Sequence, residues 1–357
     1  MLTRRSVLAA LAAPVAPPLV RFPKKIRVGI IGLEGHTGLI TGPALALPEV
    51  EIVAVCDDDS AALANFLRHR TLATAHGYAD YHRMLDAERL DVVAVCNNNG
   101  ERAGAILASV ERGLHVMAEK PLALNRADLG RIQAAVARKN VKLGMLLEMR
   151  YDPFYRALRD IVRSGALGEV AQISAQKSYQ AGQREAWYKR RETYGSTILW
   201  IGIHMIDLMR FTSGREPTRV SSFMGHVGFP DLGAMENTTV SAFQLDNGGT
   251  ATLHMDYYRP KTAATHGDDR LRLAGTRGVA EYMAATGLTV ITEKSPPATV
   301  NTLPPAGSVF LDFLENAYLN KPASLPLSEI YRVCEITLAA HEAAVTGRVV
   351  EIGIAPL

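Results

Sequence analysis

The chain has 357 residues, of which 48% are apolar and 21% are charged, with a formal net charge of +3. A single hydrophobic core stops growing at roughly 250–300 residues, so this length predicts two domains of an ordinary globular protein. The net charge is small for this size, which argues against nucleic acid as a partner.

Residues 1–23 are predicted to form a segment outside the fold. Arg4 and Arg5 come near its start, and a weakly apolar stretch broken by prolines follows them. Such a stretch is too short for stable membrane insertion and is typical of an export signal. The arginine pair resembles a twin-arginine signal, which predicts a periplasmic or otherwise exported protein. A basic tail on a cytoplasmic enzyme is the alternative.

From residue 24 to about residue 148, short apolar runs alternate with helical segments. Runs of Val, Ile and Ala indicate strands buried on both faces, and the helices between them indicate right-handed crossovers. The runs are IRVGIIG, EIVAVC, DVVAVC, HVMAEKP and VKLGMLL. This pattern predicts an α/β domain of the Rossmann type, with a doubly wound parallel sheet.

A glycine-rich turn follows the first of these strands. Its glycines recur every third residue, one residue longer than the dinucleotide-binding pattern G-x-G-x-x-G, and a helix of small and apolar residues comes next. A helix N-terminus offers free N–H groups and a partial positive charge to a pyrophosphate. We therefore expect a cofactor site rather than an empty tight turn. The expected contacts are Gly32, Gly35, His36, Thr37 and Gly38.

Acidic residues bear on the choice of cofactor. Asp57 lies 19 residues beyond Gly38, at the end of the next predicted strand, where a carboxylate accepts hydrogen bonds from the adenosine ribose. Asp58 and Asp59 follow it, and this negative charge would repel a 2′-phosphate. NAD is therefore expected in preference to NADP. Glu34, inside the turn, would repel a pyrophosphate unless its side chain turned outward.

The three cysteines show no metal-binding spacing, and no metal site is expected. Cys56 and Cys96 end two predicted strands that flank the first strand. Two strand spacings of about 4.8 Å exceed the ~4.4–6.8 Å that a disulfide allows between Cα atoms. We expect both thiols to stay reduced.

Residues 149–357 differ in character, because their apolar runs are longer and alternate with polar residues. These runs are GEVAQISAQKSY, RVSSFMGHVG, TTVSAFQLDNGGTATLHMDYY and RLRLAGTRGVAEYM. DNGG signals a hairpin turn, and two helical segments would cover one face of the sheet. The pattern predicts an α+β domain with a largely antiparallel open sheet, through which we expect a homo-oligomer to form.

Residues 177–196 interleave basic and aromatic side chains, a combination that suits a carbohydrate or an anionic group. A solvated basic loop is the alternative. Arg184 and Tyr188 belong to this pattern. The candidates for substrate contact are Lys177, Tyr179, Trp187 and Tyr194.

Several motifs occur in the order that characterises one family of oxidoreductases. They are EKP after the predicted fifth strand, then RYDP, GALGEV, GIHMIDL, AGTRGVAE and AAVTGRVVEI. From about residue 25 to the C-terminus, the chain resembles the Gfo/Idh/MocA oxidoreductases, which include glucose-fructose oxidoreductase and inositol dehydrogenase. The resemblance implies NAD(P)-dependent oxidation or reduction of a sugar, polyol or related carbonyl compound, in a cleft between the two domains.

The resemblance implies that Lys120 and His204 are catalytic, with Pro121 holding the turn of the lysine. An ammonium can polarise a substrate oxygen, and an imidazole can exchange the proton that leaves during hydride transfer. Without the motifs, a surface lysine and a core histidine are the alternatives. The motifs add further candidates, namely Glu119, Lys120 and Pro121 at the cofactor, and Arg150 and Asp207 at the substrate.

Two motifs depart from the family pattern. Family members often carry an aspartate four residues before the histidine, where this chain has Trp200, so we expect His204 to work without that carboxylate. Asn97 and Asn98 replace a Thr-Pro pair at the cofactor, and Arg102 replaces a histidine. Helical spacing places Trp200 and His204 on one face, which predicts Trp200 as a platform for substrate or cofactor. The alternative is that Trp200 fills the core.

Together these features predict an NAD-dependent oxidoreductase that acts on a sugar, polyol or sugar derivative by hydride transfer at a carbinol or carbonyl carbon. One alternative is an NAD-dependent glycosidase, which oxidises the sugar transiently, eliminates the aglycone and restores the cofactor. The other is a non-catalytic homologue that binds a sugar or the cofactor.

Overall fold

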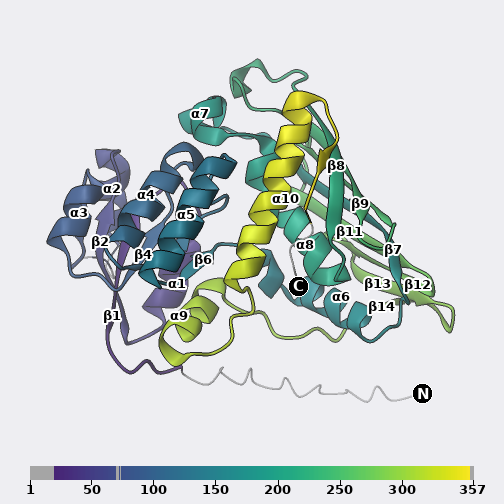
Figure 1. Ribbon diagram of the computed structural model, residues 1–357, viewed down its shortest axis with the longest axis horizontal. Coiled ribbons are helices and arrows are strands. Elements are labelled where there is room, and N and C mark those ends of the chain that lie inside the picture. The colour runs from purple at the N-terminus through teal and green to yellow at the C-terminus, as the bar shows by residue number, and fades with distance from the viewer. Residues whose placement is uncertain (1–19, 70–71, 73, 354–357) are drawn as a thin grey trace, which may run out of the picture.

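The computed structural model describes residues 20–69, 72 and 74–353. Arg4 and Arg5 of the predicted export signal lie outside this range, so export stays a prediction. Two sheets with their helices lie next to each other, the first made by the earlier part of the chain and the second by the later part (Figure 1).

The first sheet has six parallel strands in the order β3-β2-β1-β4-β5-β6, which confirms the predicted Rossmann-type fold. The strand missing from the prediction is β3, a three-residue strand without an apolar run. The strands are β1 (Ile26–Ile31), β2 (Val50–Cys56), β3 (His76–Tyr78), β4 (Val92–Val95), β5 (His115–Ala118) and β6 (Leu143–Met145).

Five helices connect these strands. Side chains of Asp59, Asp80, Asn98 and Asn125 accept hydrogen bonds from N–H groups in the first turns of four of them, which explains where these helices begin. The helices are α1 (Gly38–Leu45), α2 (Ser60–Leu67), α3 (Tyr81–Ala87), α4 (Asn99–Glu111) and α5 (Arg126–Lys139).

The second sheet has nine strands in the order β14-β13-β12-β11-β7-β10-β9-β8-β15, and only the β7–β10 pair is parallel. The predicted α+β architecture with a largely antiparallel sheet is confirmed. The strands are β7 (Val170–Tyr179), β8 (Pro217–Gly225), β9 (Thr238–Leu245), β10 (Thr250–Asp256), β11 (Gly267–Gly275), β12 (Gly278–Met283), β13 (Gly287–Thr292), β14 (Ser295–Thr299) and β15 (Val350–Glu351).

Helices cover one face of the second sheet, and its other face carries none in Figure 1. The covering helices are α6 (Pro153–Arg163), α8 (Ile203–Ser213) and α10 (Leu327–Thr346). A π-helical turn, Ile198–Gly202, leads directly into α8. The remaining short elements are 3₁₀ turns at Glu148–Tyr151, Ala186–Lys189 and Pro230–Leu232, and the helix α7 (Arg191–Tyr194).

One late helix, α9 (Val309–Leu319), packs against the first sheet. Its buried residues Phe310, Phe313 and Leu314 belong to the same apolar cluster as Ile26 and Ile30 of β1. The predicted domain boundary near residue 148 stays a prediction, and the chain returns to the first sheet well beyond that point. The first domain is therefore completed by residues close to the C-terminus.

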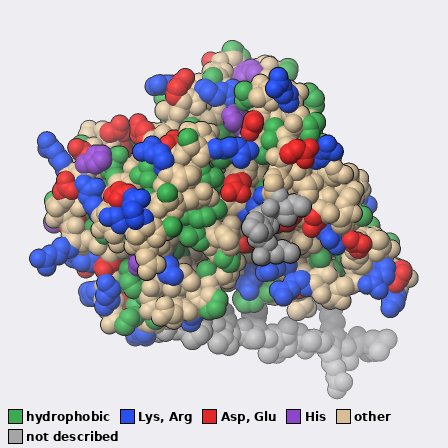
Figure 2. Space-filling view, viewed as in Figure 1, with side chains coloured by type: hydrophobic (Ala, Val, Ile, Leu, Met, Phe, Trp, Pro, Cys, Tyr) green, Lys and Arg blue, Asp and Glu red, His purple; other side chains and the backbone are tan. Residues whose placement is uncertain are grey.

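The cysteines are free and buried. Cys56 ends β2 and Cys96 follows β4, on opposite sides of β1, so the sheet itself keeps these two thiols apart as expected. On the surface, basic and acidic side chains are interspersed over the face shown in Figure 2, in keeping with the small net charge. No helix in the described part of the chain is long and apolar enough to cross a bilayer.

Candidate functional site

The glycine turn lies where the carboxyl ends of β1 and β4 meet. Gly32 has φ +81°, and a Cβ there would lie 2.2 Å from the Asn97 Cα, so the two backbones touch. A Cβ on Gly35 would lie 2.6 Å from Cγ of Glu119. Gly38, the first residue of α1, has no such crowding, because a Cβ there would meet no described atom within 4 Å. The turn is packed against its neighbours and open at the helix N-terminus.

Asp57 ties the end of β2 to this turn. Its carboxylate accepts hydrogen bonds from the backbone N–H of Leu33 (2.8 Å) and of Asp59 (2.8 Å). Burial raises the pKa of Asp57, while these N–H donors lower it. The side chain is 7% exposed and lines the cavity described next.

A cavity of about 480 Å³ opens beside Asp57, at the point where the strand order reverses between β1 and β4. Open α/β sheets bind nucleotides at this point. Glu34 lines the cavity, and its buried Oε2 has no partner among the described residues. Burial raises the pKa of Glu34, and the charge of Asp57 adds to that rise. The lining residues include Gly32, Asp57, Asp58, Asn97, Gly100 and Gly104.

These features fit a dinucleotide. The crowded Gly32, the open helix start at Gly38 and the ribose-side carboxylate of Asp57 are the elements that such a ligand requires. Asn97 adds a buried Oδ1 without a partner in the described structure, on the wall of the same cavity. Asn98 instead caps α4 by accepting from the Glu101 N–H (3.2 Å).

Lys120 follows β5 and precedes Pro121 through a cis peptide bond. The lysine is 1% exposed, and its Nζ donates to the Trp200 backbone oxygen (3.0 Å) and lies 3.2 Å from the centroid of the indole ring. Burial lowers the pKa of Lys120 to about 8, although the neighbouring Glu119 carboxylate raises it. Ammonium and amine forms are therefore both accessible near neutral pH.

Glu119 is fully buried and connects the glycine turn to the lysine. Its carboxylate pairs with His36 Nδ1 and accepts from the Lys120 N–H (2.6 Å). Burial alone would raise the pKa of Glu119, but the positive charges of Lys120 and His36 outweigh it and hold that pKa at about 2. The His36 ring stacks on Trp200, with centroids 5.9 Å apart, so the turn reaches the next cavity.

A second, smaller cavity of about 150 Å³ is lined by both expected catalytic residues, Lys120 and His204. The structure thus brings together Lys120, His204, Trp200 and Tyr179, as the sequence predicted, and adds His36 from the glycine turn. Other lining residues were not predicted as site residues: Glu148, Met149, Arg184, Tyr188, Ile201, Tyr257 and His266. Arg184 and Tyr188 lie in the basic and aromatic segment, which could have identified them, whereas Glu148 and Tyr257 carry no motif.

His204 is 4% exposed, and its Nδ1 has no partner among the described residues. Burial, with added repulsion from Lys120 and Lys177, holds the pKa of His204 well below its usual value. The imidazole is therefore neutral at physiological pH and can either accept or donate a proton.

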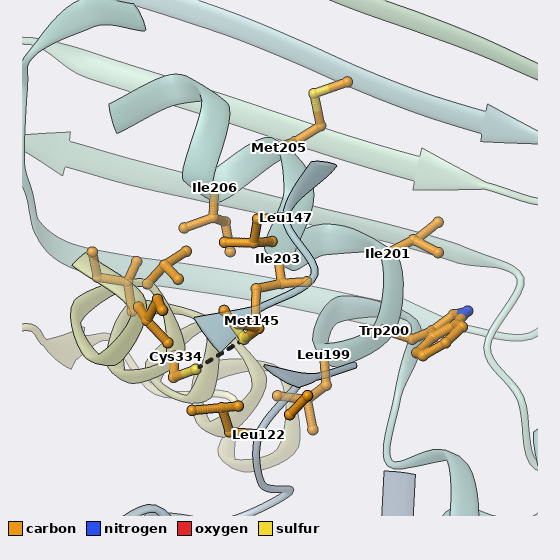
Figure 3. Packing of buried hydrophobic residues seen from close by; sticks show 14 of the residues in the cluster. Leu122, Met145, Leu147, Leu199, Trp200, Ile201, Ile203, Met205, Ile206 and Cys334 are labelled. Carbon is orange, nitrogen blue, oxygen red and sulfur yellow. Dashed lines mark hydrogen bonds between the residues drawn. The ribbon is translucent and has the colours of Figure 1, made fainter. Parts of the chain in front are cut away.

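Trp200 lies in the π-helical turn before α8 rather than in a regular helix with His204. Figure 3 shows its indole pointing away from the aliphatic cluster that Ile203 and Ile206 form with Met145 and Leu147. The ring is nonetheless only 4% exposed. Trp200 lines the cavity and is also a packed side chain. The prediction of a platform for substrate or cofactor and the alternative of a core residue are therefore each correct in part.

Arg150 and Asp207 are not brought to the cavity. The guanidinium of Arg150 donates to Asp207 through Nε (2.7 Å) and Nη2 (2.6 Å), and Nη2 also reaches Glu329 (3.0 Å). Both partners are nearly inaccessible, at 4% and 2% side-chain exposure. Their charges satisfy each other, so the pair joins elements of the fold, and the expected substrate contact stays a prediction.

Three further substrate candidates lie outside the cavity lining. Lys177 is buried and paired with Asp269 (2.7 Å). Tyr194 is buried, with its hydroxyl 3.2 Å from that of Tyr257. Trp187 stacks on Tyr188 at 3.8 Å and supports the cavity wall from behind. None of these three side chains lines the cavity itself. Each one supports the cavity wall indirectly, through a neighbouring residue of the wall or through the packing beneath it.

Arg102 is a positioning residue that the sequence flagged only as a departure. It is fully buried and donates through Nη1 to the backbone oxygens of Lys120 (2.9 Å) and Pro121 (3.0 Å), and through Nη2 to that of Asn97. Nη1 of Arg102 also donates a hydrogen bond to Asn99 Oδ1 (2.7 Å). One arginine thus holds the turn after β5 against the turn after β4, between the two cavities.

Within the described residues, no cluster of three or more His, Cys, Asp or Glu side chains is arranged to hold a metal ion. The candidate site therefore consists of a nucleotide-sized cavity at the switch point and a polar cavity that adjoins it through His36, Glu119 and Lys120.

The comparison with known proteins agrees with this geometry. In three dimensions the chain is similar to the solved structure described as "putative oxidoreductase from Thermotoga maritima", with 30% identity, a TM-score of 0.85, and coverage of 92% of this chain and 100% of the other. Levoglucosan dehydrogenase in complex with NADH shares the fold at 18% identity, with a TM-score of 0.79 and coverage of 92% and 100%.

Among curated proteins, the chain is 27% identical over 260 residues to the 1,5-anhydro-D-fructose reductase of Ensifer adhaerens, which covers 72% of this chain and 70% of that protein. Several other relatives align over 54–65% of their own length. Residues 26–146 match the family described as "Oxidoreductase family, NAD-binding Rossmann fold", and residues 155–281 match the "GFO/IDH/MocA C-terminal domain". The chain therefore belongs to the GFO/IDH/MocA family of NAD-binding oxidoreductases.

Proposed function

We propose that this protein oxidises a carbinol carbon of a sugar, polyol or sugar derivative, or reduces the corresponding carbonyl, with NAD as the hydride carrier. The observation that carries the proposal is the placement of Lys120, with a pKa of about 8, in one cavity with a neutral His204. That cavity adjoins the glycine turn through His36.

When bound, NAD⁺ accepts the hydride that leaves the substrate carbon. The chain supplies the proton chemistry, because the amine of Lys120 can take the hydroxyl proton as the C=O bond forms. His204 can hold the same oxygen by a hydrogen bond, since its imidazole is neutral and its Nδ1 is free of described partners. In the reverse direction the ammonium returns the proton to the carbonyl oxygen.

The walls of the cavity favour a carbohydrate-like substrate. Tyr179, Tyr188 and Trp200 contribute aromatic rings to the lining, and Arg184 and Tyr257 add hydrogen-bonding groups. Sugars combine apolar C–H faces with hydroxyl groups and are bound by such surfaces. The similarity to an anhydrofructose reductase supports the same substrate class. Asp57, with the acidic residues after it, supports NAD over NADP.

The test replaces Lys120 by Met, which removes the amine and keeps most of the volume beneath the indole. NADH formation is followed with a panel of aldoses, inositols and linear polyols. On a compound that the wild type oxidises, the variant should lose roughly 100-fold or more in kcat. The wild-type rate should rise with pH through about 8, because oxidation requires the neutral amine and the pKa of Lys120 is lowered to that value.

Lys142→Met, at an exposed position, is the matched control and should leave the rate unchanged. Near-normal turnover by a folded Lys120→Met variant would contradict the proposal. So would binding of NAD and sugars with no turnover of any panel compound in either direction.

A further inference from the structure

A half-buried glutamate in the second cavity carries a carboxylate oxygen with no hydrogen-bonding role that the fold explains. Glu148 begins the 3₁₀ turn after β6 and lines the same cavity as Lys120, His204 and Trp200. Its Oε2 is inaccessible and has no partner among the described residues. A buried, unpaired carboxylate oxygen is costly, so its position calls for a charge or a ligand nearby.

Among the charged groups around Glu148, Lys120 is the positive charge with the largest effect on it. Burial raises the pKa of Glu148, and Lys120 is the largest influence that lowers it, followed by His36, while Glu119 raises it. Conversely, Glu148 raises the pKa of Lys120, although burial lowers that pKa and Glu119 raises it more than Glu148 does. The other charged or titratable groups facing this cavity are His204, Arg184, His266, Tyr179, Tyr188 and Tyr257.

Among the described residues that line this cavity, no other carboxylate lies where it could balance the charge of Lys120. Of the described residues that line this cavity, Glu148 is the acidic one. Glu119 is engaged by His36 and by a backbone N–H. Trp200 occupies the position four residues before His204 and offers an indole, which cannot balance a positive charge as a carboxylate does.

We propose that Glu148 is a second counter-ion of Lys120, beside Glu119, and so a positioning residue for the proton transfer to that lysine. This rests on the proposed function. As the substrate is oxidised, its O–H bond breaks and the proton passes to Lys120 Nζ. The C–H electron pair leaves as hydride to NAD⁺, and the carbonyl forms. The positive charge gained by Lys120 is balanced by the Glu148 carboxylate, which lines the same cavity.

The decisive experiment needs no substrate. Protein labelled with ¹³C-lysine is titrated by NMR, and the Lys120 resonance is assigned with Lys120→Arg. Glu148→Gln should lower the pKa of Lys120 by roughly one unit or more, as expected for loss of a nearby opposite charge. Glu148→Asp retains the charge and should stay close to the wild type, and it keeps the test decisive if the glutamine variant folds poorly. Glu192→Gln, 73% exposed, is the matched control and should change nothing.

An unchanged Lys120 titration in folded Glu148→Gln would overturn the proposal, as would a pKa shift of equal size in Glu148→Asp. If the panel assay yields a substrate, the pH profile of kcat in Glu148→Gln should move to lower pH by the same amount, with KM little changed. A shifted titration in a protein that oxidises no panel compound would support the pairing and count only against the proposed function.

Discussion

At the scale of single residues, Trp200 occupies a position where family members often carry an aspartate, and its indole both lines the cavity and packs against its neighbours. Its indole covers the Nζ of Lys120 on one side and stacks on His36, while Trp187 meets it edge-on with centroids 5.3 Å apart. By excluding water from Lys120, the indole contributes to the burial that lowers the pKa of that lysine. In the proposed reaction, an indole at this position adjusts the proton chemistry of Lys120 through desolvation.

Trp200→Ala should destabilise the protein by about 3–5 kcal/mol, because a packed aromatic side chain leaves a cavity. Trp200→Phe should lose much less and keep much of the activity. Urea denaturation measures the first quantity, and KM for the panel substrate measures the loss of the cavity wall. Phe229→Ala, 44% exposed, is the control and should lose under about 1 kcal/mol. A comparably small loss for Trp200→Ala would show that the indole is not part of the core.

Asp57 tests the cofactor assignment at the same scale. Asp57→Ala removes a carboxylate that holds the Leu33 N–H and faces the nucleotide cavity. NAD affinity, measured by calorimetry, should weaken by about 1–3 kcal/mol. NADP affinity should fall less, because a negative charge that opposes its phosphate is also lost. Asp86→Ala, an exposed ion-pair partner of Arg112, should leave both affinities unchanged. Equal losses for the two cofactors would remove Asp57 from the ribose site.

Among the elements, α8 connects the cavity of Lys120 and His204 to the helical layer of the second domain. His204 lies in its first turn, and Asp207, one turn later, pairs with Arg150. Arg210 continues the network by binding Glu216 and Glu329, the latter in α10. The helix is thus fixed in rotation by charges along its length, and this determines the orientation of His204.

Arg150→Met tests whether this pair is structural. Removing the guanidinium leaves Asp207 buried without its partner, which typically costs about 3–5 kcal/mol in unfolding free energy. Arg131→Met, which breaks an exposed pair with Asp128 (3.0 Å), should cost under about 1 kcal/mol. Chemical denaturation distinguishes the two. A large rise in KM with little loss of stability would instead restore Arg150 to the substrate site.

For the whole molecule, the bare face of the nine-stranded sheet is the broadest surface without covering helices in Figure 1. Phe223 on β8 and Val240 on β9 are cross-strand partners, and they are 68% and 41% exposed. An exposed apolar pair on an uncovered sheet face is typical of a surface that another subunit buries. The expected homo-oligomer would use this face.

Phe223→Lys and Val240→Lys should each shift the protein toward its monomer mass of 38.7 kDa in sedimentation experiments. The reason is that a buried lysine without a partner opposes association. Val345→Lys, at an exposed position of α10, should leave the association state unchanged. A wild-type protein that sediments as a monomer at all concentrations would contradict the expectation directly.

The sequence by itself determined the features that are local. Short apolar runs predicted five of the six parallel strands, and the glycine spacing and EKP motif located the turn and the lysine. Such signals work because strand burial, tight turns and helix starts are set by residues close in the chain. The strands β3, β13, β14 and β15 escaped prediction. Strands β3 and β15 are short and β14 is exposed, and such strands carry little periodicity.

Only the tertiary structure decided which polar groups share the cavity. Glu148, Lys120, His204 and Tyr257 come from four separate segments, and no local pattern links them. It also decided that Arg150 and Asp207 neutralise each other, and that α9 returns to the first sheet. These outcomes depend on how crossovers and helices pack over long sequence distances. The pKa values that make Lys120 and His204 useful follow from burial, which exists only once the two domains are packed together.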